Sequence, residues 1–310
     1  MRPVASKANE NLSRLPTERP NSTAENLDLK SSLEIVRIIN SQDAEVAAAV
    51  EAALHQIARG IDVIAEALKK GGRLFYVGAG TSGRIAALDA SECPPTFNPH
   101  RRMVQFVIAG GTKALHTATE ASEDSHALGR REIAKKKPGK KDIVVGVAAS
   151  GRTPFTVAAI EYARHHGAKI IAVTCNPNSP LGKAADLVIV AQVGPEVIAG
   201  SSRMKAGTAE KMILNMLSTG AMTRLGYVYG NLMINLHVKN YKLRERAFTI
   251  LEQLAAISRK AAKEALRASG DDVPVALVML QANVSRAQAT RALKSTKGNV
   301  RQAIAAARPL

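Results

Sequence analysis

Five short apolar runs alternate with segments of helical pattern, and this alternation restricts the chain to few folds. The runs are Leu74–Val77, Val104–Ile108, Ile143–Val147, Ile170–Val173 and Leu187–Val190. Such short and mostly apolar runs predict strands that are buried on both faces. Because helical patterns separate these runs, the sequence predicts an α/β fold in which helices flank both faces of a parallel sheet.

The chain divides into three predicted parts. Residues 1–30 are polar and contain several prolines, so we expect a loose N-terminal arm. Residues 31–250 hold the predicted sheet, and a helical region over 31–70 precedes the first strand. Over 251–310 the composition shifts to Ala, Lys and Arg, and glycine and proline interrupt the helical pattern. This last part predicts a small C-terminal module of three short helices.

Charge and composition narrow the classes of partner. The formal net charge is +17, and a basic balance attracts nucleic acid, anionic membranes or phosphorylated small molecules. Aromatic residues make up only 3% of the chain and Trp is absent, so stacking surfaces for nucleic-acid bases are scarce. The densest basic run, over 130–141, has no nucleic-acid-binding motif beside it and is interpreted as a solvated surface. We therefore expect a phosphorylated small molecule, and neither nucleic acid nor a membrane, as partner.

Cysteine and histidine usage predicts a cytoplasmic protein without a metal site. Cys93 and Cys175 do not form a CxxC pair, and this pattern favours a reducing compartment. The N-terminal residues lack the apolar core of a signal peptide, and no apolar run is long enough to span a bilayer. The seven histidines show no metal-ligand spacing.

Two glycine-containing loops match each other in sequence. Residues 77–84 read VGAGTSGR and residues 145–152 read VGVAASGR, which are identical at five of eight positions. Each loop follows a predicted strand and precedes a helix, where backbone N–H groups lack a partner and the helix dipole favours negative charge. Glycines allow close approach of a ligand, and Ser or Thr hydroxyls add donors. The pair therefore predicts an anion site suited to phosphate.

The first loop resembles two other glycine motifs only superficially. It has Gly78, Gly80 and Gly83, but the acidic residue of a dinucleotide fingerprint is missing at its usual spacing. The Gly-Lys-Ser/Thr ending of a P-loop is missing as well. The alternative that stays open is that these glycines only make tight turns.

Three carboxyl groups are candidates for acid–base chemistry, which needs such groups at a cleft. Glu92 follows the short helix expected after the first loop, and Pro94 and Pro95 predict a non-helical exit behind it. Glu120 and Glu123 share one face if their segment is helical. Spacing alone favours surface positions for these residues.

The start of a long helix, expected from about Met204 to Leu225, is a further candidate for anion binding. Ser201, Ser202 and Lys205 lie there, and hydroxyls and an ammonium group at a helix N-terminus favour an anion. The simpler alternative is that Ser202 caps the helix.

At these motifs the sequence resembles the N-acetylmuramic acid 6-phosphate etherases, within the sugar-isomerase (SIS) domain superfamily. Two highly specific segments carry the resemblance, LDASECPPT at 88–96 and GSSRMKAGT at 200–208. Shorter matches are EASEDS at 120–125, CNP at 175–177 and GNLM at 230–233. The similarity runs from about Leu15 to the C-terminal helices, whereas the glycine loops are shared with the wider superfamily.

The resemblance implies a reaction and its residues. Members of the family cleave the D-lactyl ether at C3 of the sugar by elimination and then add water, which gives N-acetylglucosamine 6-phosphate and D-lactate. Motif matching gives Glu92 the role of proton donor and makes Glu123 the second catalytic carboxylate, with Glu120 open as the alternative base. The resemblance further implies that no metal or organic cofactor is needed. It also implies a role in the catabolism of cell-wall amino sugars and a homodimer with active sites near the dimer interface.

The loops and the helix start supply the expected binding residues. Ser82, Ser150, Gly151 and Thr153 correspond to sugar-phosphate-binding positions of SIS domains. We add Gly80, Thr81, Ser201, Ser202 and Lys205 as substrate- or phosphate-binding residues. Many SIS relatives carry polar residues where this chain and the etherase motif have Ala148 and Ala149, so fewer hydroxyls reach the phosphate from the second loop.

Two other functions stay open at this point. A non-catalytic sugar-phosphate sensor, similar to the regulatory protein of glucokinase, would bind a sugar phosphate without turnover, and the presence of both Glu92 and Glu123 argues against it. A ketose–aldose isomerase of the same superfamily would interconvert sugar phosphates without releasing lactate, and the 88–96 segment is not typical of isomerases.

Overall fold

A parallel five-stranded sheet organises the larger part of the chain. The structure is a computed structural model that describes residues 15–236, 238 and 240–308. The strands are β1 (Leu74–Gly78), β2 (Val104–Ile108), β3 (Ile143–Val147), β4 (Lys169–Thr174) and β5 (Leu187–Val190). They lie in the order β2-β1-β3-β4-β5, and every pair is parallel. The predicted α/β fold is confirmed, and each strand boundary agrees with the prediction to within one residue.

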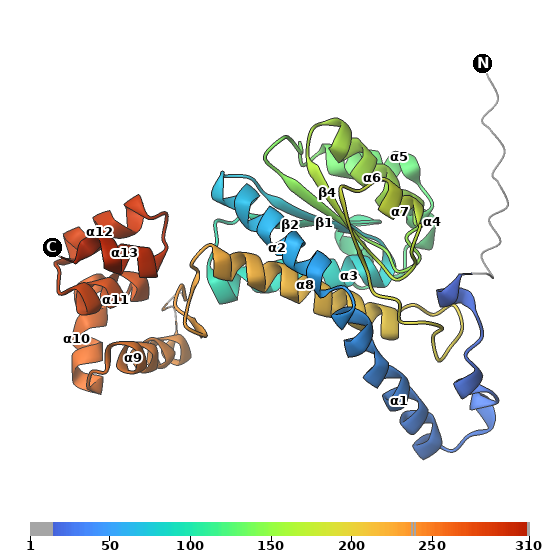
Figure 1. Ribbon diagram of the computed structural model, residues 1–310, viewed down its shortest axis with the longest axis horizontal. Coiled ribbons are helices and arrows are strands. Elements are labelled where there is room, and N and C mark those ends of the chain that lie inside the picture. The colour runs from blue at the N-terminus through green and yellow to red at the C-terminus, as the bar shows by residue number, and fades with distance from the viewer. Residues whose placement is uncertain (1–14, 237, 239, 309–310) are drawn as a thin grey trace.

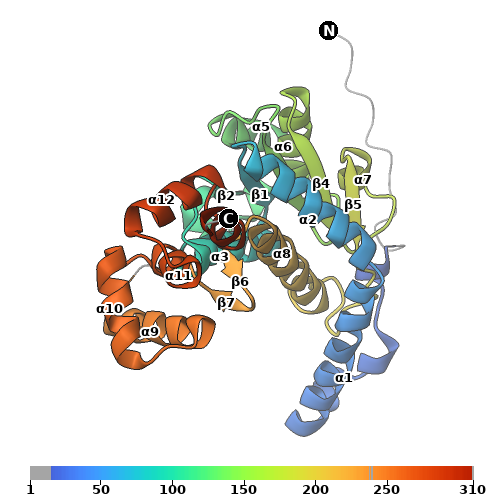
Figure 2. The same cartoon turned by 60° about the vertical axis from the view of Figure 1, so that its left-hand side comes forward.

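Helices cover both faces of the sheet (Figures 1 and 2). One face is covered by α1 (Ser32–Glu51), α2 (Leu54–Lys69), α3 (Gly80–Phe97) and α8 (Lys205–Arg224). The other face is covered by α5 (His126–Ala134), α6 (Pro154–His165) and α7 (Pro180–Lys183). Side chains of β1 alternate between the two cores, with Leu74 and Tyr76 in the first and Phe75 and Val77 in the second. Burial on both sides explains why the strands read as continuous apolar runs.

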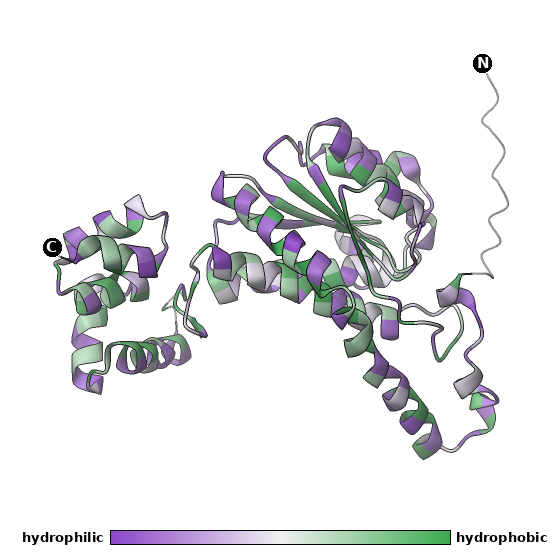
Figure 3. Ribbon diagram, viewed as in Figure 1, coloured by the Kyte–Doolittle hydropathy of each residue, from purple (hydrophilic) through white to green (hydrophobic). Residues whose placement is uncertain are grey.

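The first half of α1 extends away from the sheet domain (Figure 1, lower right). Leu33 and Val36 on this half are 56% and 55% exposed, and Leu29 just before the helix is 80% exposed. Figure 3 shows this end as a mixture of hydrophobic and hydrophilic residues. Clustered aliphatic side chains on a protruding helix are typical of a surface that another chain covers.

Residues 15–21 are packed against the domain, although the sequence predicts a loose arm over 1–30, whereas residues 22–30 are mostly exposed. Residues 15–30 form three short 3-10 helices, Pro16–Glu18, Ser22–Ala24 and Leu27–Leu29. Asn21 is buried and its Nδ2 donates to Gln42 Oε1 at 2.8 Å, while Asn176 donates to the buried Thr17 hydroxyl at 3.1 Å. Thr17 and Asn21 are therefore paired with buried groups from distant parts of the chain, which a local pattern does not reveal. Residues 1–14 of the predicted arm lie outside the described residues.

Helix α3 is longer than the sequence predicts at both ends. The expected loop over 78–83 is short because the helix already begins at Gly80, and the expected exit at Pro94 and Pro95 is wrong because the helix continues through both to Phe97. The helix ends where Asn98 adopts a left-handed conformation with φ of 48° and donates its N–H to the Pro94 carbonyl at 3.0 Å. Burial of Phe97 holds this last turn in place.

The C-terminal part forms a helical module beside the sheet domain (Figure 1, left). Its elements are β6 (Val228–Tyr229), β7 (Leu232–Met233), α9 (Tyr241–Ala255), α10 (Arg259–Ser269), α11 (Val273–Ala282), α12 (Arg286–Ser295) and α13 (Val300–Ala307). Four helices follow residue 255 where the sequence predicts three, because four separate N-caps begin them. These caps are Ser258, Asp272, Ser285 and Asn299. The predicted boundary near residue 250 falls inside α9, whose buried residues share one core with α10–α13.

None of the described helices is both long and apolar enough to cross a bilayer.

Candidate active site

The two glycine loops lie side by side where the chain reverses direction along the sheet. The chain moves from β1 outward to β2 and then returns to the other side of β1 to form β3. Gly78 at the end of β1 pairs with Val147 at the end of β3. Ligands of open parallel sheets bind at such a switch point, beyond the carboxyl ends of the strands. The sheet order therefore places the predicted anion site where the two loops meet.

The two loops differ in structure despite their matching sequences. The first turns into α3 at Gly80, so Thr81 and Ser82 lie in the first turn of a helix. The second stays an open loop over 148–153, and α6 begins only at Pro154. The repeat therefore brings together a helix N-terminus and a loop, which offer different sets of donors to one ligand.

The second loop is held tightly by its neighbours. Gly151 has a φ of +66°, and a β-carbon there would overlap the Ser179 side chain. Its carbonyl accepts a hydrogen bond from the N–H of Leu181 at 2.9 Å, and the Thr174 hydroxyl donates to the Ala149 carbonyl at 3.2 Å. Within the described residues the Thr153 hydroxyl does not cap α6, so it can bond to a ligand.

Replacing Gly151 with alanine is expected to destabilise the protein by about 2 kcal/mol or more. The left-handed backbone alone costs a residue with a β-carbon about 1–2 kcal/mol, and the overlap with Ser179 adds to it. Denaturant unfolding measures the change. Gly139→Ala is the matched control, because a β-carbon at Gly139 meets no atom within 4 Å. Equal stability of the two variants would contradict this description of the loop.

The structure brings Glu123 to the first loop. Glu123 ends the short helix α4 (Glu120–Glu123), and its Oε1 lies 2.8 Å from where a β-carbon of Gly80 would be. Burial raises the pKa of the Glu123 carboxyl, and repulsion from Glu120 and Asp124 raises it further against a smaller opposing effect of Arg84. Glu120 itself is exposed. Of the two candidate bases, Glu123 is therefore the one whose carboxyl lies against the loop.

Glu92 lies far from Glu123 within the same chain. It is exposed on the outer side of α3, twelve residues after Gly80. At 1.5 Å per residue this corresponds to about 18 Å along the helix axis. Leu88, one turn earlier on the same side, is 50% exposed. One chain thus holds the two predicted catalytic carboxylates near opposite ends of one helix.

The predicted anion site at the start of α8 is already filled by a carboxylate. The helix begins at Lys205, and Glu196 accepts hydrogen bonds from the backbone N–H groups of Lys205 and Ala206, both at 3.0 Å. Glu196 therefore satisfies the helix end, instead of the capping by Ser202 considered from the sequence. The Lys205 ammonium is 1% exposed and donates to Gln42 of α1 at 2.8 Å. Its charge thus faces α1, whereas Ser201 and Ser202 stay partly exposed before the helix.

A buried carboxyl that the sequence analysis did not identify contacts the first loop. The Ser82 hydroxyl donates to Glu210 Oε1 at 2.8 Å, and Glu210 is only 1% exposed. Burial, with a smaller contribution from Glu196, raises the pKa of Glu210 to about 8. One signal in the sequence could have identified Glu210: it is an acidic residue on the buried side of a helix, between Ala209 and Ile213.

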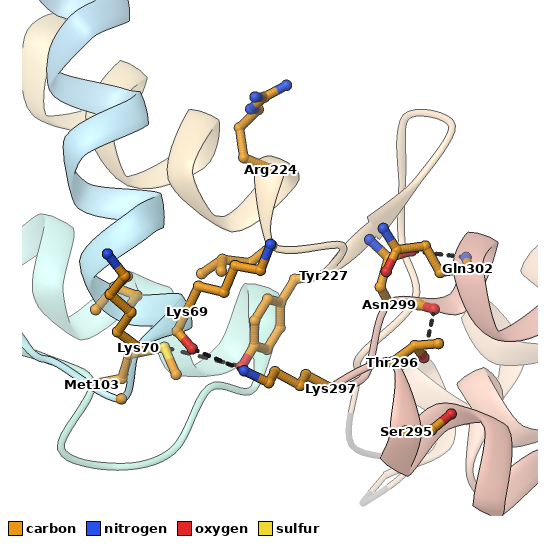
Figure 4. Close-up of a pocket in the computed structure, with 13 residues that line it drawn as sticks. Lys69, Lys70, Met103, Arg224, Tyr227, Ser295, Thr296, Lys297, Asn299 and Gln302 are labelled. Atoms are coloured by element: carbon orange, nitrogen blue, oxygen red, sulfur yellow. Dashed lines mark hydrogen bonds between the residues drawn. The ribbon is translucent and has the colours of Figure 1, made fainter.

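A cavity of about 620 Å³ lies elsewhere, between the sheet domain and the C-terminal module (Figure 4). Lys69, Arg224 and Ser295 on its wall lie in the last turns of α2, α8 and α12. Three helix C-termini present partial negative charge to this cavity. Lys297 neutralises part of it by donating to the Lys69 carbonyl at 3.5 Å. The cavity is therefore a poor site for a phosphate, despite its lysines.

Among the residues that the structure describes, no group of three or more His, Cys, Asp or Glu side chains could hold a metal ion.

Comparisons with known proteins agree with the fold and with the sequence motifs. The glucokinase regulatory protein N-terminal SIS domain matches residues 56–164, and the SIS domain matches 136–219. The HYPK UBA domain matches 274–307, which covers α11–α13. A phosphoheptose isomerase from Francisella tularensis has a similar structure, with a TM-score of 0.50 and 18% identity over 63% of this chain and 100% of that chain. This likeness concerns the fold alone.

Curated relatives match along nearly the whole chain. An N-acetylmuramic acid 6-phosphate etherase from Symbiobacterium thermophilum is 55% identical over 88% of this chain and 91% of its own. N-acetylmuramic acid 6-phosphate etherase 1 from Bacillus licheniformis is 45% identical over 96% of this chain and 97% of its own. A third etherase, from Photobacterium profundum, is 46% identical over 95% of this chain and 98% of its own.

Proposed function

The chain belongs to the family of N-acetylmuramic acid 6-phosphate etherases, and we propose that it carries out their reaction with Glu92 and Glu123 as catalytic carboxylates. It is a carbon–oxygen lyase. It cleaves the D-lactyl ether of N-acetylmuramic acid 6-phosphate to give N-acetylglucosamine 6-phosphate and D-lactate, in the catabolism and recycling of cell-wall amino sugar. The observation that carries this conclusion is the identity of 45–55% to such etherases over most of the chain.

Glu123 is proposed as the base that starts the elimination. The proton at C2 of the ring-opened sugar is acidic because of the neighbouring aldehyde, so a carboxylate can remove it. The Glu123 carboxyl lies against Gly80, at the point where the two loops would hold the substrate. A carboxyl with a raised pKa is a stronger base once it is deprotonated, and this suits proton removal from carbon.

The phosphate is proposed to bind between the second loop and the start of α3. Ser150, Gly151 and Thr153 would grip it from the loop, while Thr81 and Ser82 and the free N–H groups of the first turn of α3 would contact it from the other side. The helix dipole compensates for the hydroxyls that Ala148 and Ala149 lack. We do not extend this proposal to Lys205, because its ammonium is bonded to Gln42.

The position of Glu92 leads us to infer a homodimer. The acid must reach the oxygen on C3 while the base reaches the proton on C2, and each needs hydrogen-bond distance to its atom. Glu92 lies about 18 Å along α3 from Gly80, against which the Glu123 carboxyl packs, so the two carboxylates of one chain cannot act on neighbouring atoms. Glu92 of the partner subunit would therefore complete the site that holds Glu123. The exposed Leu88 on the same side of α3, and Leu33 and Val36 on α1, supply apolar surface for such contact.

The cytoplasm is the proposed location of this reaction. Cys93 and Cys175 are both buried and free, as thiols in a reducing compartment are.

Release of D-lactate from N-acetylmuramic acid 6-phosphate is the direct test of the function. Purified protein is incubated with the substrate, and D-lactate and N-acetylglucosamine 6-phosphate are measured separately. Equal amounts of both products are expected. Binding of the sugar phosphate without lactate would support the sensor instead. Interconversion of sugar phosphates without lactate would support the isomerase.

Glu123→Gln is expected to lower kcat for lactate release by about a hundredfold, because a neutral amide cannot remove a proton from C2. Glu120→Gln is the matched control, since it removes an exposed carboxylate three residues away. It should leave kcat within about threefold and move the acid limb of the kcat/KM profile to lower pH, because Glu120 raises the pKa of Glu123. A larger loss in Glu120→Gln than in Glu123→Gln would exchange the two roles.

A further inference from the structure

Glu210 is a buried carboxyl that the proposed mechanism does not use. It lies on the second turn of α8, where its Oε1 accepts a hydrogen bond from Ser82. Its Oε2 is buried as well and has no hydrogen-bond partner among the described residues. A buried carboxyl with an unpaired oxygen costs stability, so its presence beside a ligand site indicates a functional use.

The packing of α8 on α3 directs Glu210 to the substrate site. Gly207 of α8 lies so close to α3 that an added β-carbon would be 3.4 Å from Thr81 Cγ2 and 3.4 Å from Ile85. Glu210 follows Gly207 by three residues and so lies on the same side of α8. Its carboxyl therefore contacts the first turn of α3, where it meets the Ser82 hydroxyl.

We propose that Glu210 is a positioning residue that controls the Ser82 hydroxyl. In its uncharged form the carboxyl group donates its O–H to Ser82 Oγ, which leaves the Ser82 proton free to bond to an oxygen of the sugar phosphate. In its ionised form Glu210 accepts a hydrogen bond from the Ser82 hydroxyl, which is then not available to the ligand, and adds a negative charge beside the phosphate. This inference rests on the proposed function only in its choice of ligand.

The surroundings of Glu210 favour the uncharged form at neutral pH. Cys175 after β4 and Glu196 before α8 face it, and Lys205 begins its own helix. Glu196 repels the ionised form, and Lys205 directs its ammonium to Gln42 on α1. The resulting pKa of about 8 means that Glu210 is uncharged at pH 7 and becomes ionised as the pH rises above 8.

The expected consequence is weaker binding of the sugar phosphate at alkaline pH. If only the protein with uncharged Glu210 binds well, the dissociation constant rises about tenfold between pH 7 and pH 9. The phosphate of the ligand does not contribute, because its second pKa is about 6 and it is a dianion over this range.

The test is the dissociation constant of N-acetylglucosamine 6-phosphate at pH 7 and pH 9, measured by calorimetry. Glu210→Gln keeps a donor to Ser82 and cannot ionise, so its affinity should be close to wild type at pH 7 and unchanged at pH 9. Glu210→Met removes the donor, so binding should be several-fold weaker at both pH values. Asp89→Asn, a control at another buried carboxyl with a raised pKa, should keep the wild-type pH dependence.

Two results would overturn the inference. One is a Glu210→Gln variant that loses affinity at pH 9 as wild type does, and the other is a Glu210→Met variant that binds like wild type. Thermal unfolding of each variant at both pH values excludes loss of the fold as a cause. Lactate release, assayed on the same preparations, distinguishes this inference from the proposed function, because binding does not require turnover.

Discussion

Glu92→Gln is expected to reduce D-lactate release by about a thousandfold or more. The lactate oxygen is a poor leaving group unless it receives a proton, and an amide cannot donate one as a carboxylic acid does. Binding of N-acetylglucosamine 6-phosphate should stay within about twofold of wild type, because the loops are proposed to hold the phosphate, whereas Glu92 is proposed to act only on the departing lactate oxygen, which this ligand lacks. Lactate release under saturating substrate, together with calorimetry for binding, measures both quantities.

The control for this variant is Glu51→Gln, which removes another exposed carboxylate at the end of α1. It should leave lactate release unchanged. Since the Glu92 side chain is exposed, its replacement should also leave the unfolding temperature unchanged. Lactate release by Glu92→Gln within fivefold of wild type would exclude Glu92 as the proton donor.

Mixed dimers of two inactive variants are expected to recover activity. If Glu92 acts in the site of the partner subunit, a dimer of one Glu92→Gln chain and one Glu123→Gln chain has one intact site and one site without either carboxylate. Each mixed dimer should show about half of the wild-type lactate release, since a symmetric dimer has two equivalent sites. Co-expression with two different tags and sequential purification isolates these dimers.

Lactate release by the mixed dimers also distinguishes a site shared between two subunits from a site within one chain. Both homodimers of the single variants should stay nearly inactive under identical conditions. If Glu92 and Glu123 acted within one chain, every site of the mixed dimer would lack one carboxylate and activity would not return. Failure of the two tagged chains to copurify would contradict the homodimer itself.

The strands were predictable because their physical signal is local. A run such as Ile143–Val147 has no polar side chain and is buried on both faces, so a buried strand is predicted from its composition alone. The paired loops were predictable for the same reason, since glycine and hydroxyl residues follow β1 and β3 directly. That Gly80 and Glu123 touch was not predictable, because the contact depends on how α4 folds back over the loop.

Helix ends and polar partners account for most of the remaining differences. Pro94 and Pro95 indicate the end of a helix by local rules, yet burial of Phe97 carries α3 past them. At the start of α8, Ser202 is the expected cap, but the carboxylate of Glu196 arrives from outside the helix and replaces it. In both cases a tertiary contact outweighs the local preference.

Between the two functional ends of α3, the count of residues matters more than their identity. Gly80 begins the helix at one pocket, and Glu92 lies twelve residues further on, where the partner's pocket is proposed. Inserting or deleting one residue between them would turn Glu92 by about 100° around the helix and shift it by about 1.5 Å along the axis. The segment between them can therefore accept substitutions on its outer side. A change in its length would instead move the Glu92 carboxyl away from the lactate oxygen that it is proposed to protonate.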